Sequence, residues 1–312
     1  MPTKHCQLII LGSGPAGYTA AVYAARANLN PLVVAGREAG GQLMLTSDVD
    51  DFPGFEEGIQ GPDLMLAMRK QAERFGTEFV DEDFTEGDLS PPAGGPFRIT
   101  AGEKTFEGKA LIIATGADTK WLDVSGEKEK IGRGVSSCAP CDAFFFKNKK
   151  VVVVGGGDSA MEEALVLTNF ASEITVVHRS ETLRASQIMQ DKAKKNPKIK
   201  FLFNTEVTKI LGDEKVTGAE LRNNKTNEVL KMDLDGVFVA IGHIPNTMKF
   251  KVIDLDEKGY MKVKDHTRTN IDGVFVAGDV HDSHYRQAVT AAGFGCMAAL
   301  EADHFLRGID IP

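Results

Sequence analysis

Two cysteines separated by two residues, Cys138 and Cys141, are the side chains of this sequence best suited to redox chemistry. Such a pair can store two electrons as a dithiol and release them when the disulfide forms. Asp142 follows directly and is placed either to exchange a proton with a thiol or to cap a helix. The spacing also occurs in zinc sites, but a structural zinc site needs four ligands and the sequence has no second pair. Cys6 and Cys296 stand alone, and we interpret both as small buried apolar residues.

A glycine-rich loop near the N-terminus predicts a dinucleotide-binding unit. An apolar strand over 7–11 leads into Gly12-Ser13-Gly14-Pro15-Ala16-Gly17, and an alanine-rich helix to about residue 27 and a strand over 31–35 follow. The glycines permit a tight turn, and the start of the helix attracts a pyrophosphate. Glu38 lies a few residues past the second strand and is the candidate for binding a ribose.

The same pattern occurs again after the cysteines. A strand over 150–154 runs into Gly155-Gly156-Gly157-Asp158-Ser159-Ala160, and a helix over 161–169 and a strand over 173–177 follow. His178-Arg179-Ser180 and Arg184 come next, where an NAD site would place an acid. Arginines at this point suit the 2′-phosphate of NADPH, although a solvated basic loop is the alternative. Two such units in one chain predict two Rossmann-like domains.

Two further strands end in residues that suit a nucleotide. The strand over 110–114 ends in Thr115-Gly116, and the strand over 274–277 ends in Gly278-Asp279. An acid at the carboxyl edge of a parallel sheet accepts hydrogen bonds from a ribose or polyol, whereas its ordinary role is that of a turn or capping residue. Asp279 is therefore a second candidate for binding a cofactor.

The composition is that of a globular enzyme of two domains. The chain has 312 residues, of which 42% are hydrophobic and 26% charged, and its net charge is −8. The negative charge disfavours nucleic acid as a partner. No apolar run approaches the ~20 residues that span a membrane, and the N-terminus has no signal pattern, so we expect a cytoplasmic protein without membrane contact.

Taken together, these segments resemble the low-molecular-weight, bacterial-type thioredoxin reductases of the pyridine nucleotide-disulfide oxidoreductase family. The matching segments are GSGPAG at 12–17, GGQL at 40–43, FPGF at 52–55, ATGA at 114–117, CAPCD at 138–142, GGGDSA at 155–160, AIGHIPNT at 240–247 and GDVHDSHYRQA at 278–288. The resemblance implies an α/β, three-layer FAD/NAD(P)-binding fold with two Rossmann-like domains, the second inserted into the first. An FAD-binding domain would comprise 1–117 and 246–312, and an NADPH-binding domain carrying the cysteines would comprise 118–245.

The resemblance also implies roles for individual residues. Cys141 would be the sulfur nearer the flavin, Cys138 would attack the substrate disulfide and Asp142 would protonate the leaving thiolate. The residues expected to bind FAD are Gly12, Ser13, Gly14, Pro15, Ala16, Gly17, Glu38, Gly41, Gln42, Asp51, Thr115, Gly116, Gly278, Asp279, Arg286, Gln287 and Ala288. Those expected to bind NADPH are Gly155, Gly157, Asp158, Ser159, Ala160, His178, Arg179, Arg184, Ile241 and Gly242. Arg133, Phe144 and Phe145 would receive thioredoxin.

The implied activity is that of an FAD-dependent, NADPH-linked thioredoxin-disulfide reductase acting as a homodimer. Electrons would pass from NADPH through FAD to the Cys138–Cys141 disulfide and then to oxidised thioredoxin. Ser180 stands where this family usually has a second arginine. This difference leaves open a related flavoenzyme with another electron partner, either a dithiol oxidase that uses oxygen or a reductase fed by ferredoxin or NADH. No metal site is expected.

Overall fold

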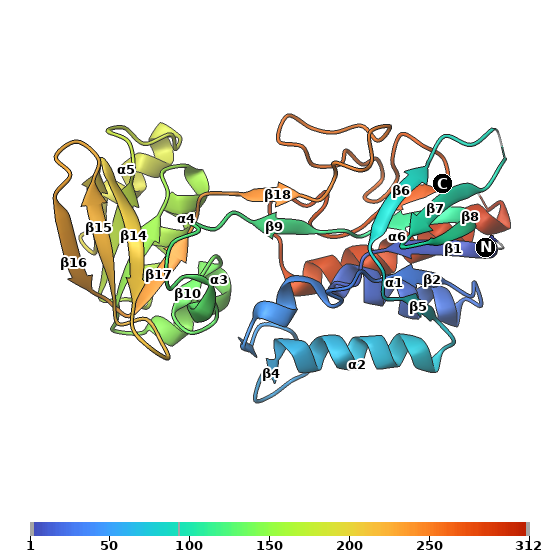
Figure 1. The fold of residues 1–312 in the computed structure, drawn as a ribbon, viewed down its shortest axis with the longest axis horizontal. Coiled ribbons are helices and arrows are strands. Elements are labelled where there is room, and N and C mark those ends of the chain that lie inside the picture. Colours follow the sequence, from blue (N-terminus) through green and yellow to red (C-terminus); the bar gives the residue numbers. More distant parts are fainter. Residues whose placement is uncertain (1–2, 93, 310–312) are drawn as a thin grey trace. The chain divides into compact units, whose positions relative to one another are not determined.

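The computed structural model describes residues 3–92 and 94–309 and divides into two compact units. The first unit contains the described residues up to Thr46, then Phe52–Asp118 and those from Ile244 onward; the second contains Ser47–Asp51 and Thr119–His243. The chain leaves the first unit along β9 (Ala117–Thr119) and returns along β18 (His243–Pro245) (Figure 1). The second unit is thus inserted in the sequence of the first.

The first unit is built on one mixed sheet with the strand order β5-β2-β1-β8-β7-β6. The strands β5, β2, β1 and β8 are parallel, β7 and β6 are antiparallel, and β19 pairs in parallel with the end of β8. The strands are β1 (Lys4–Leu11), β2 (Leu32–Val34), β5 (Glu78–Val80), β6 (Phe84–Asp88), β7 (Phe97–Ala101), β8 (Lys104–Ile113) and β19 (Val274–Val276). The helices are α1 (Pro15–Arg26), α2 (Gly61–Arg74) and α6 (Ala288–Arg307), and the shorter elements are η1 (Gly41–Leu45) and β4 (Ile59–Gln60). Strand β3 (Asp48–Val49) lies in the segment Ser47–Asp51, which is grouped with the second unit.

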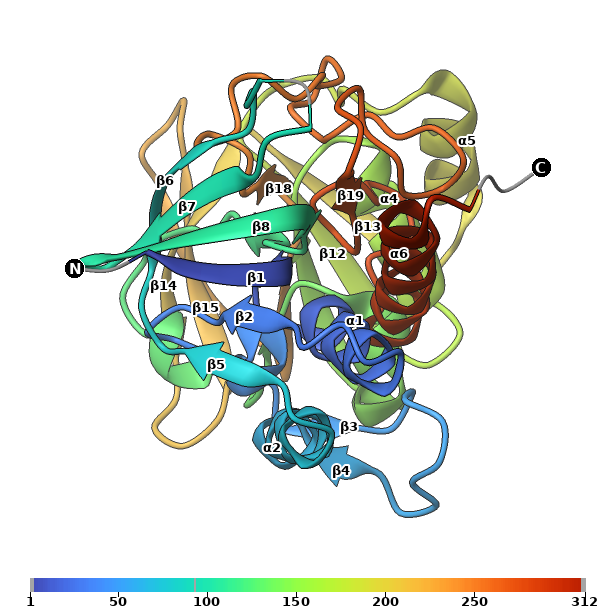
Figure 2. The same cartoon turned by 90° about the vertical axis from the view of Figure 1, so that its right-hand side faces the viewer.

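Strand β1 is buried on both faces because it lies in the middle of this sheet. Leu8 and Ile10 pack with α1 and α6 on one face, and Ile9 and Leu11 pack with β7 and β8 residues on the other. This alternation follows from the period of two in a strand, and it explains why the run reads as continuously apolar. Figure 2 shows α1 and α6 side by side along the sheet, where alanines in both helices permit close packing.

The second unit contains a parallel sheet with the order β10-β17-β11-β12-β13 and an antiparallel sheet with the order β14-β15-β16. Val151 and Val153 of β11 face the helices, whereas Val152 and Val154 face the antiparallel sheet. The unit therefore has three layers: helices, parallel sheet and antiparallel sheet. Its strands are β10 (Val135–Ser136), β11 (Lys150–Val154), β12 (Glu173–His178), β13 (Ile199–Phe203), β14 (Thr205–Leu211), β15 (Gly218–Asn223), β16 (Val229–Asp233) and β17 (Gly236–Val239). Its helices are η2 (Lys128–Lys130), α3 (Ala139–Asp142), η3 (Ala143–Phe146), α4 (Asp158–Leu167) and α5 (Gln187–Lys195).

The predicted fold class is confirmed, with local differences in the element bounds. Helix α4 begins at Asp158, three residues before the predicted start, because Gly157 is its N-cap and Asp158 suits the first helical turn. Strand β1 begins at Lys4, since its first residues pair with Phe106 and its neighbours in β8. Cys6 and Cys296 are free cysteines as expected, but both are only partly buried.

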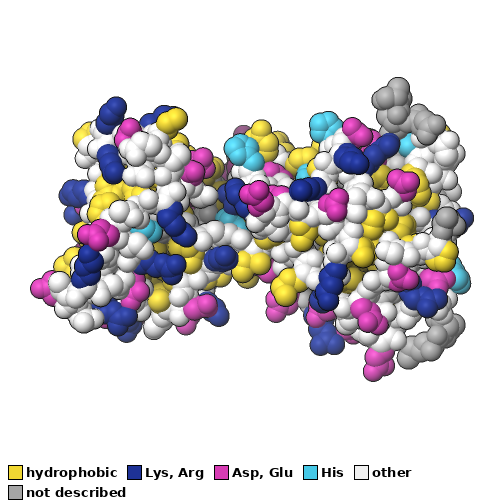
Figure 3. All heavy atoms as spheres, turned by 90° about the horizontal axis from the view of Figure 1, so that it is seen from above, with side chains coloured by type: hydrophobic (Ala, Val, Ile, Leu, Met, Phe, Trp, Pro, Cys, Tyr) yellow, Lys and Arg dark blue, Asp and Glu magenta, His cyan; other side chains and the backbone are white. Residues whose placement is uncertain are grey.

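On the face shown in Figure 3, acidic and basic side chains are interspersed over the surface. Over residues 3–92 and 94–309, we find no helix with both the length and the apolar character needed to cross a bilayer.

Candidate functional site

The two cysteines of the CxxC pair form a disulfide at the start of a short helix. Cys138 is the N-cap of α3, and its sulfur accepts a hydrogen bond from the backbone N–H of Cys141 at 3.3 Å. Ser136, at the end of β10, receives the N–H of Cys138 on its Oγ at 3.0 Å. The chain thus enters the helix from a buried strand, and one serine fixes the backbone of the first cysteine.

Asp142 lies beside the disulfide in a poorly hydrated position. Burial raises the pKa of its carboxyl, a hydrogen bond with the Ser136 side chain opposes the rise, and the charge of Asp51 adds to it. Partial loss of water also raises the pKa of Asp51 itself, although this residue is at the surface. A raised pKa favours the acid form of the carboxyl, which suits a proton donor.

The capping alternative for Asp142 is confirmed in position only. Asp142 is the N-cap residue of η3, but its side chain makes no capping hydrogen bond there, and the N-cap of α3 is Cys138. A different carboxylate serves this turn: Glu163 of α4 accepts the backbone N–H of Ala139. No local pattern predicts this contact, because 24 residues separate the partners.

Two of three consecutive phenylalanines after the disulfide are exposed. The exposed fractions are 66% for Phe144 and 39% for Phe145, whereas Phe146 is buried against Phe238. Phe144 contacts Phe145 and Phe170 edge to face. Arg133 is also exposed. Large exposed aromatics next to a redox centre are suited to binding a protein partner.

The first glycine loop leaves the start of α1 open for a ligand. Gly14 is the N-cap of α1 without a side-chain cap, Pro15 follows at the first turn, and a Cβ added to Gly14 would meet no protein atom within 4 Å. At Gly17, by contrast, an added Cβ would lie 2.1 Å from the Gly12 carbonyl oxygen. Gly17 is therefore needed for packing, whereas Gly14 leaves free space at a helix N-terminus. This arrangement fits the pyrophosphate of a dinucleotide.

Ser13 joins the first loop to the segment containing Gly41 and Gln42. Its buried Oγ donates to the Ala35 carbonyl at 2.6 Å and accepts the N–H of Gly40 at 3.0 Å. Gln42 reaches across to Asp118, donating from Nε2 at 3.1 Å. Glu38 is exposed in the turn after β2, where a ribose hydroxyl could reach it.

Asp279 follows β19 at the carboxyl edge of the sheet. Loss of water raises the pKa of its carboxyl to about 7; the charge of Asp282 contributes to the rise and Arg286 opposes it. A carboxyl in this environment gains from hydroxyl donors, so the site fits the polyol of a flavin nucleotide. Ala288 begins α6, whose N-cap Gln287 forms a capping box with Thr290.

Asp282 organises this loop and was not anticipated from the sequence. Its buried carboxylate accepts the backbone N–H groups of His284, Tyr285 and Arg286 at 2.9–3.1 Å. Arg286 is held at a φ of 51°, a conformation that is uncommon for non-glycine residues. The short Asp-x-His spacing was a usable indication of such a turn. Nearby, burial lowers the pKa of His281 to about 4.

Thr115 and Gly116 bind the returning chain in the first unit. The Thr115 hydroxyl donates to the Asn246 carbonyl, and the Asn246 side chain donates to the Thr115 carbonyl, both at 3.0 Å. The N–H of Asn246 donates to the Gly116 carbonyl, also at 3.0 Å. Asn246 was not among the predicted site residues, although it lies in the AIGHIPNT segment.

The second glycine loop has the same open geometry as the first. Gly157 caps α4 without a side-chain bond, and an added Cβ would meet nothing within 4 Å. The Gly156 carbonyl accepts the N–H groups of Arg184 and Ala185 at 2.7 and 3.0 Å. Asp158 accepts both the N–H and the hydroxyl of Ser186 at 2.8 and 2.9 Å. Arg184 is therefore fixed next to the loop, which fits a nucleotide carrying a further phosphate.

The remaining predicted nucleotide-binding residues surround this loop. The His178 ring is buried against Gly156, where an added Cβ would lie 2.3 Å from the ring, and it lies 3.0 Å from the Thr182 carbonyl oxygen. Burial lowers the pKa of His178, and the charges of Arg184 and Arg179 lower it further. Arg179 and Ser159 are exposed, and Ala160 is buried. Ile241 and Gly242 follow β17, where the Gly242 carbonyl accepts the Lys120 N–H at 3.0 Å.

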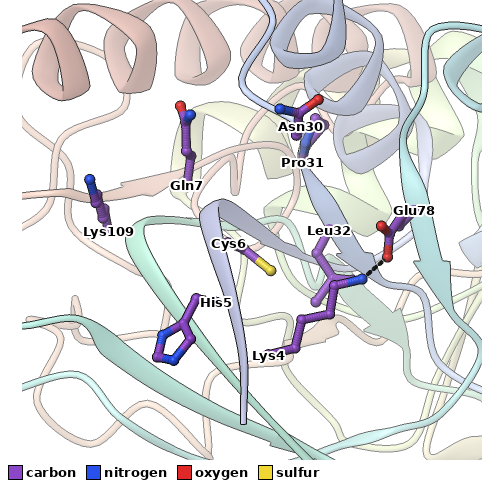
Figure 4. Close-up of a pocket in the computed structure, with 9 residues that line it drawn as sticks. All are labelled: Lys4, His5, Cys6, Gln7, Asn30, Pro31, Leu32, Glu78 and Lys109. Carbon is purple, nitrogen blue, oxygen red and sulfur yellow. Dashed lines mark hydrogen bonds and ion pairs between the residues drawn. The ribbon is translucent and has the colours of Figure 1, made fainter.

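A pocket of about 360 Å³ lies elsewhere, at the amino end of β1 (Figure 4). Its lining includes Lys4, Cys6, Asn30 and Lys109, and Lys4 pairs with Glu78 across it. Ligands of parallel α/β sheets bind at the carboxyl ends of the strands. This pocket is at the opposite end of β1 from Gly12–Gly17 and has no part in the candidate site.

Comparison with known proteins gives matches along nearly the whole chain. The family profile described as pyridine nucleotide-disulphide oxidoreductase matches residues 6–295. A thioredoxin reductase of Rickettsia bellii is 51% identical over 307 residues, which cover 96% of this chain and 98% of that protein. A bifunctional thioredoxin reductase/thioredoxin of Mycobacterium leprae is 50% identical over 96% of this chain and 66% of its own length. The solved thioredoxin reductase of Giardia duodenalis superposes with a TM-score of 0.93 at 43% identity, covering 98% of this chain and all of that one.

Proposed function

Because this chain belongs to the pyridine nucleotide-disulphide oxidoreductase family, and within it to the thioredoxin reductases, we propose that it reduces the disulfide of thioredoxin with electrons from NADPH. The observation that carries the proposal is the Cys138–Cys141 disulfide in a unit that also holds an open glycine loop. A relative whose name joins thioredoxin reductase and thioredoxin in one chain supports thioredoxin as the substrate.

The two glycine loops are the proposed cofactor sites. The first, with Asp279 and the start of α6, would hold FAD, and the second, with Arg179 and Arg184, would hold NADPH. When bound, FAD supplies the exchange of a hydride for two electrons that a disulfide can accept. The residues of the chain bind and orient the two nucleotides through helix N-termini and charged side chains.

In the thiol–disulfide step, we assign to Cys138, Cys141 and Asp142 the roles that the family resemblance implies. In the reduced protein, the Cys138 thiolate attacks one sulfur of the thioredoxin disulfide, and the other sulfur leaves as a thiolate. Asp142, in its acid form, gives that thiolate a proton. The Cys141 thiolate then attacks the Cys138 sulfur, which restores the intramolecular disulfide and expels the second thioredoxin sulfur as a thiolate. That thiolate takes a proton from water, and thioredoxin leaves as a dithiol. The raised pKa of Asp142 favours this role because burial stabilises the neutral carboxyl relative to the carboxylate.

Exposed aromatics beside the disulfide are the proposed docking surface. Phe144 and Phe145, with Arg133, would contact thioredoxin, and the protein would act as a cytoplasmic homodimer. Phe146, the last residue of η3, is buried and is not part of this surface.

Steady-state assays with NADPH, NADH and oxygen, each with and without thioredoxin, test this function. We expect thioredoxin-dependent oxidation of NADPH, with kcat/KM higher for NADPH than for NADH. Equal efficiency with the two nucleotides would contradict the NADPH assignment. Oxygen consumption that is independent of thioredoxin would instead favour a dithiol oxidase. If neither NADPH nor NADH supports thioredoxin reduction, a ferredoxin-fed reductase would be favoured.

A further inference from the structure

The loop that carries the two arginines is tied to the antiparallel sheet of the second unit. We call residues 179–184 the arginine loop. The Asn224 amide donates from Nδ2 to the Arg179 carbonyl at 3.2 Å, and the Asn204 N–H donates to the Ser180 carbonyl at 3.2 Å. Asn224 also donates its N–H to the Asn204 carbonyl at 2.6 Å. Hydrogen bonds from the turn after β15 therefore fix the backbone at Arg179.

An acidic residue in the arginine loop works against binding of a phosphate. Glu181 is two residues from Arg179, and its side chain is 73% exposed. A phosphomonoester near this loop would be repelled by the carboxylate as well as attracted by the arginines. Since residue 180 is serine, the loop has only Arg179 and Arg184 to oppose Glu181, which leaves a single net positive charge.

Lys225 supplies the missing positive charge from the same turn. Its Nζ pairs with the Glu181 carboxylate at 3.0 Å. Asn223 holds the turn by accepting the N–H groups of Lys225 and Thr226 on Oδ1. Both partners of the ion pair are mostly exposed, so the pair contributes little to folding stability. Its main consequence is local: it cancels the carboxylate and leaves both arginines available to an anion.

We propose that Lys225 determines nucleotide specificity by neutralising Glu181, and that Asn224 positions the Arg179 backbone for the 2′-phosphate of NADPH. This inference rests on the proposed function, since it deepens the assignment of the second glycine loop. The effect is restricted to nucleotides with a 2′-phosphate, because NADH presents a neutral hydroxyl at the same position. Lys225 thus compensates for Ser180 from a residue 45 positions later in the sequence.

The test compares two nucleotides in the full-length, FAD-bound protein. Lys225→Gln should lower kcat/KM for NADPH on the order of fivefold, as expected for one exposed charge, and leave that for NADH within about 1.5-fold. Lys225→Gln combined with Glu181→Gln should restore NADPH efficiency, because the repulsive carboxylate is then gone. Asn224→Ala should raise KM for NADPH more than KM for NADH, with kcat unchanged.

A matched control is available in the same sheet. Lys231 of β16 pairs with Glu220 at 3.9 Å and is similarly exposed, so Lys231→Gln removes the same charge away from the arginine loop. It should leave the NADPH-to-NADH ratio unchanged. The proposal is overturned if Lys225→Gln lowers both efficiencies equally, leaves the ratio unchanged, or matches Lys231→Gln.

Binding of 2′,5′-ADP distinguishes a failure of the NADPH assignment from a failure of the role proposed for Lys225. If the parent protein binds 2′,5′-ADP no better than 5′-AMP, then the NADPH assignment itself fails. If the parent prefers 2′,5′-ADP and Lys225→Gln retains the full preference, then only the role of Lys225 fails. We expect the parent to prefer 2′,5′-ADP and Lys225→Gln to lose about fivefold of that preference.

Discussion

Replacing Gly14 by alanine should separate cofactor binding from folding. Gly14 has a φ of −71° and a ψ of −174°, which alanine adopts without strain, and its added Cβ would meet no protein atom within 4 Å. A compatible glycine-to-alanine change stabilises a fold by about 0.4–1 kcal/mol through the unfolded chain. We therefore expect the FAD-free Gly14→Ala protein to be as stable as the parent or slightly more so.

FAD binding should respond in the opposite direction. The new methyl group would occupy the space through which a pyrophosphate reaches the N–H groups of α1. Loss of one hydrogen bond to a charged group costs about 1.5–3 kcal/mol, which corresponds to a roughly ten- to hundredfold weaker Kd. The Kd is measured by fluorescence titration of FAD into the stripped protein, and stability by urea unfolding of the same preparation.

Two glycine variants provide the comparison. In Gly17→Ala the Cβ would lie 2.1 Å from the Gly12 carbonyl oxygen, so the FAD-free fold itself should lose about 1–3 kcal/mol from overpacking. Gly293 is exposed inside α6 with open space around it, so Gly293→Ala should stabilise the helix and leave FAD binding unchanged. A Kd for Gly14→Ala within twofold of the parent would refute the placement of the pyrophosphate.

Three further outcomes are expected. Cys138→Ser and Cys141→Ser should each abolish thioredoxin turnover, whereas NADPH should still reduce the bound flavin. Loss of flavin reduction in a folded variant would contradict the order of electron transfer, in which the disulfide follows the flavin. Asp142→Asn should slow the thiol–disulfide step by about 10²–10⁴-fold in rapid-mixing assays, since an amide is no acid; a change below twofold would remove its proton-donor role. The pKa of Asp279 is higher in the folded FAD-free protein, about 7, than the ordinary 3.8, so its contribution to stability is present below about pH 4 and lost as pH rises to 7. Asp279→Asn should therefore weaken this pH dependence in urea unfolding, and an unchanged dependence would count against the buried acid.

Local patterns were sufficient to predict the two nucleotide units. A strand, a glycine turn and a helix are adjacent in sequence, and the turn itself sets the spacing of the glycines. The loops Gly12–Gly17 and Gly155–Ala160 are therefore predictable without knowledge of the tertiary structure. The buried character of β1 and β11 was visible for the same reason, since both faces of a central strand are apolar. The disulfide was predictable because its partners are three residues apart.

The residues that tune the site depended on the tertiary structure. Ser136 and Glu163 hold the backbone of the CxxC turn, and Lys225, from the turn between β15 and β16, pairs with Glu181. Serine, glutamate and lysine are ordinary surface residues in any sequence, and nothing in their local pattern distinguishes these from the others.

The pKa values of the acids were likewise decided by folding. Asp142 adjoins the CxxC pair and Asp279 follows a strand that ends in glycine, so both positions are recognisable in the sequence. Their pKa values, however, are raised by burial and by neighbouring charges. Desolvation depends on how segments far apart in the chain pack around a carboxyl. The sequence by itself therefore determined which chemical groups are present and which turns hold them, whereas the tertiary structure decided their protonation and their partners.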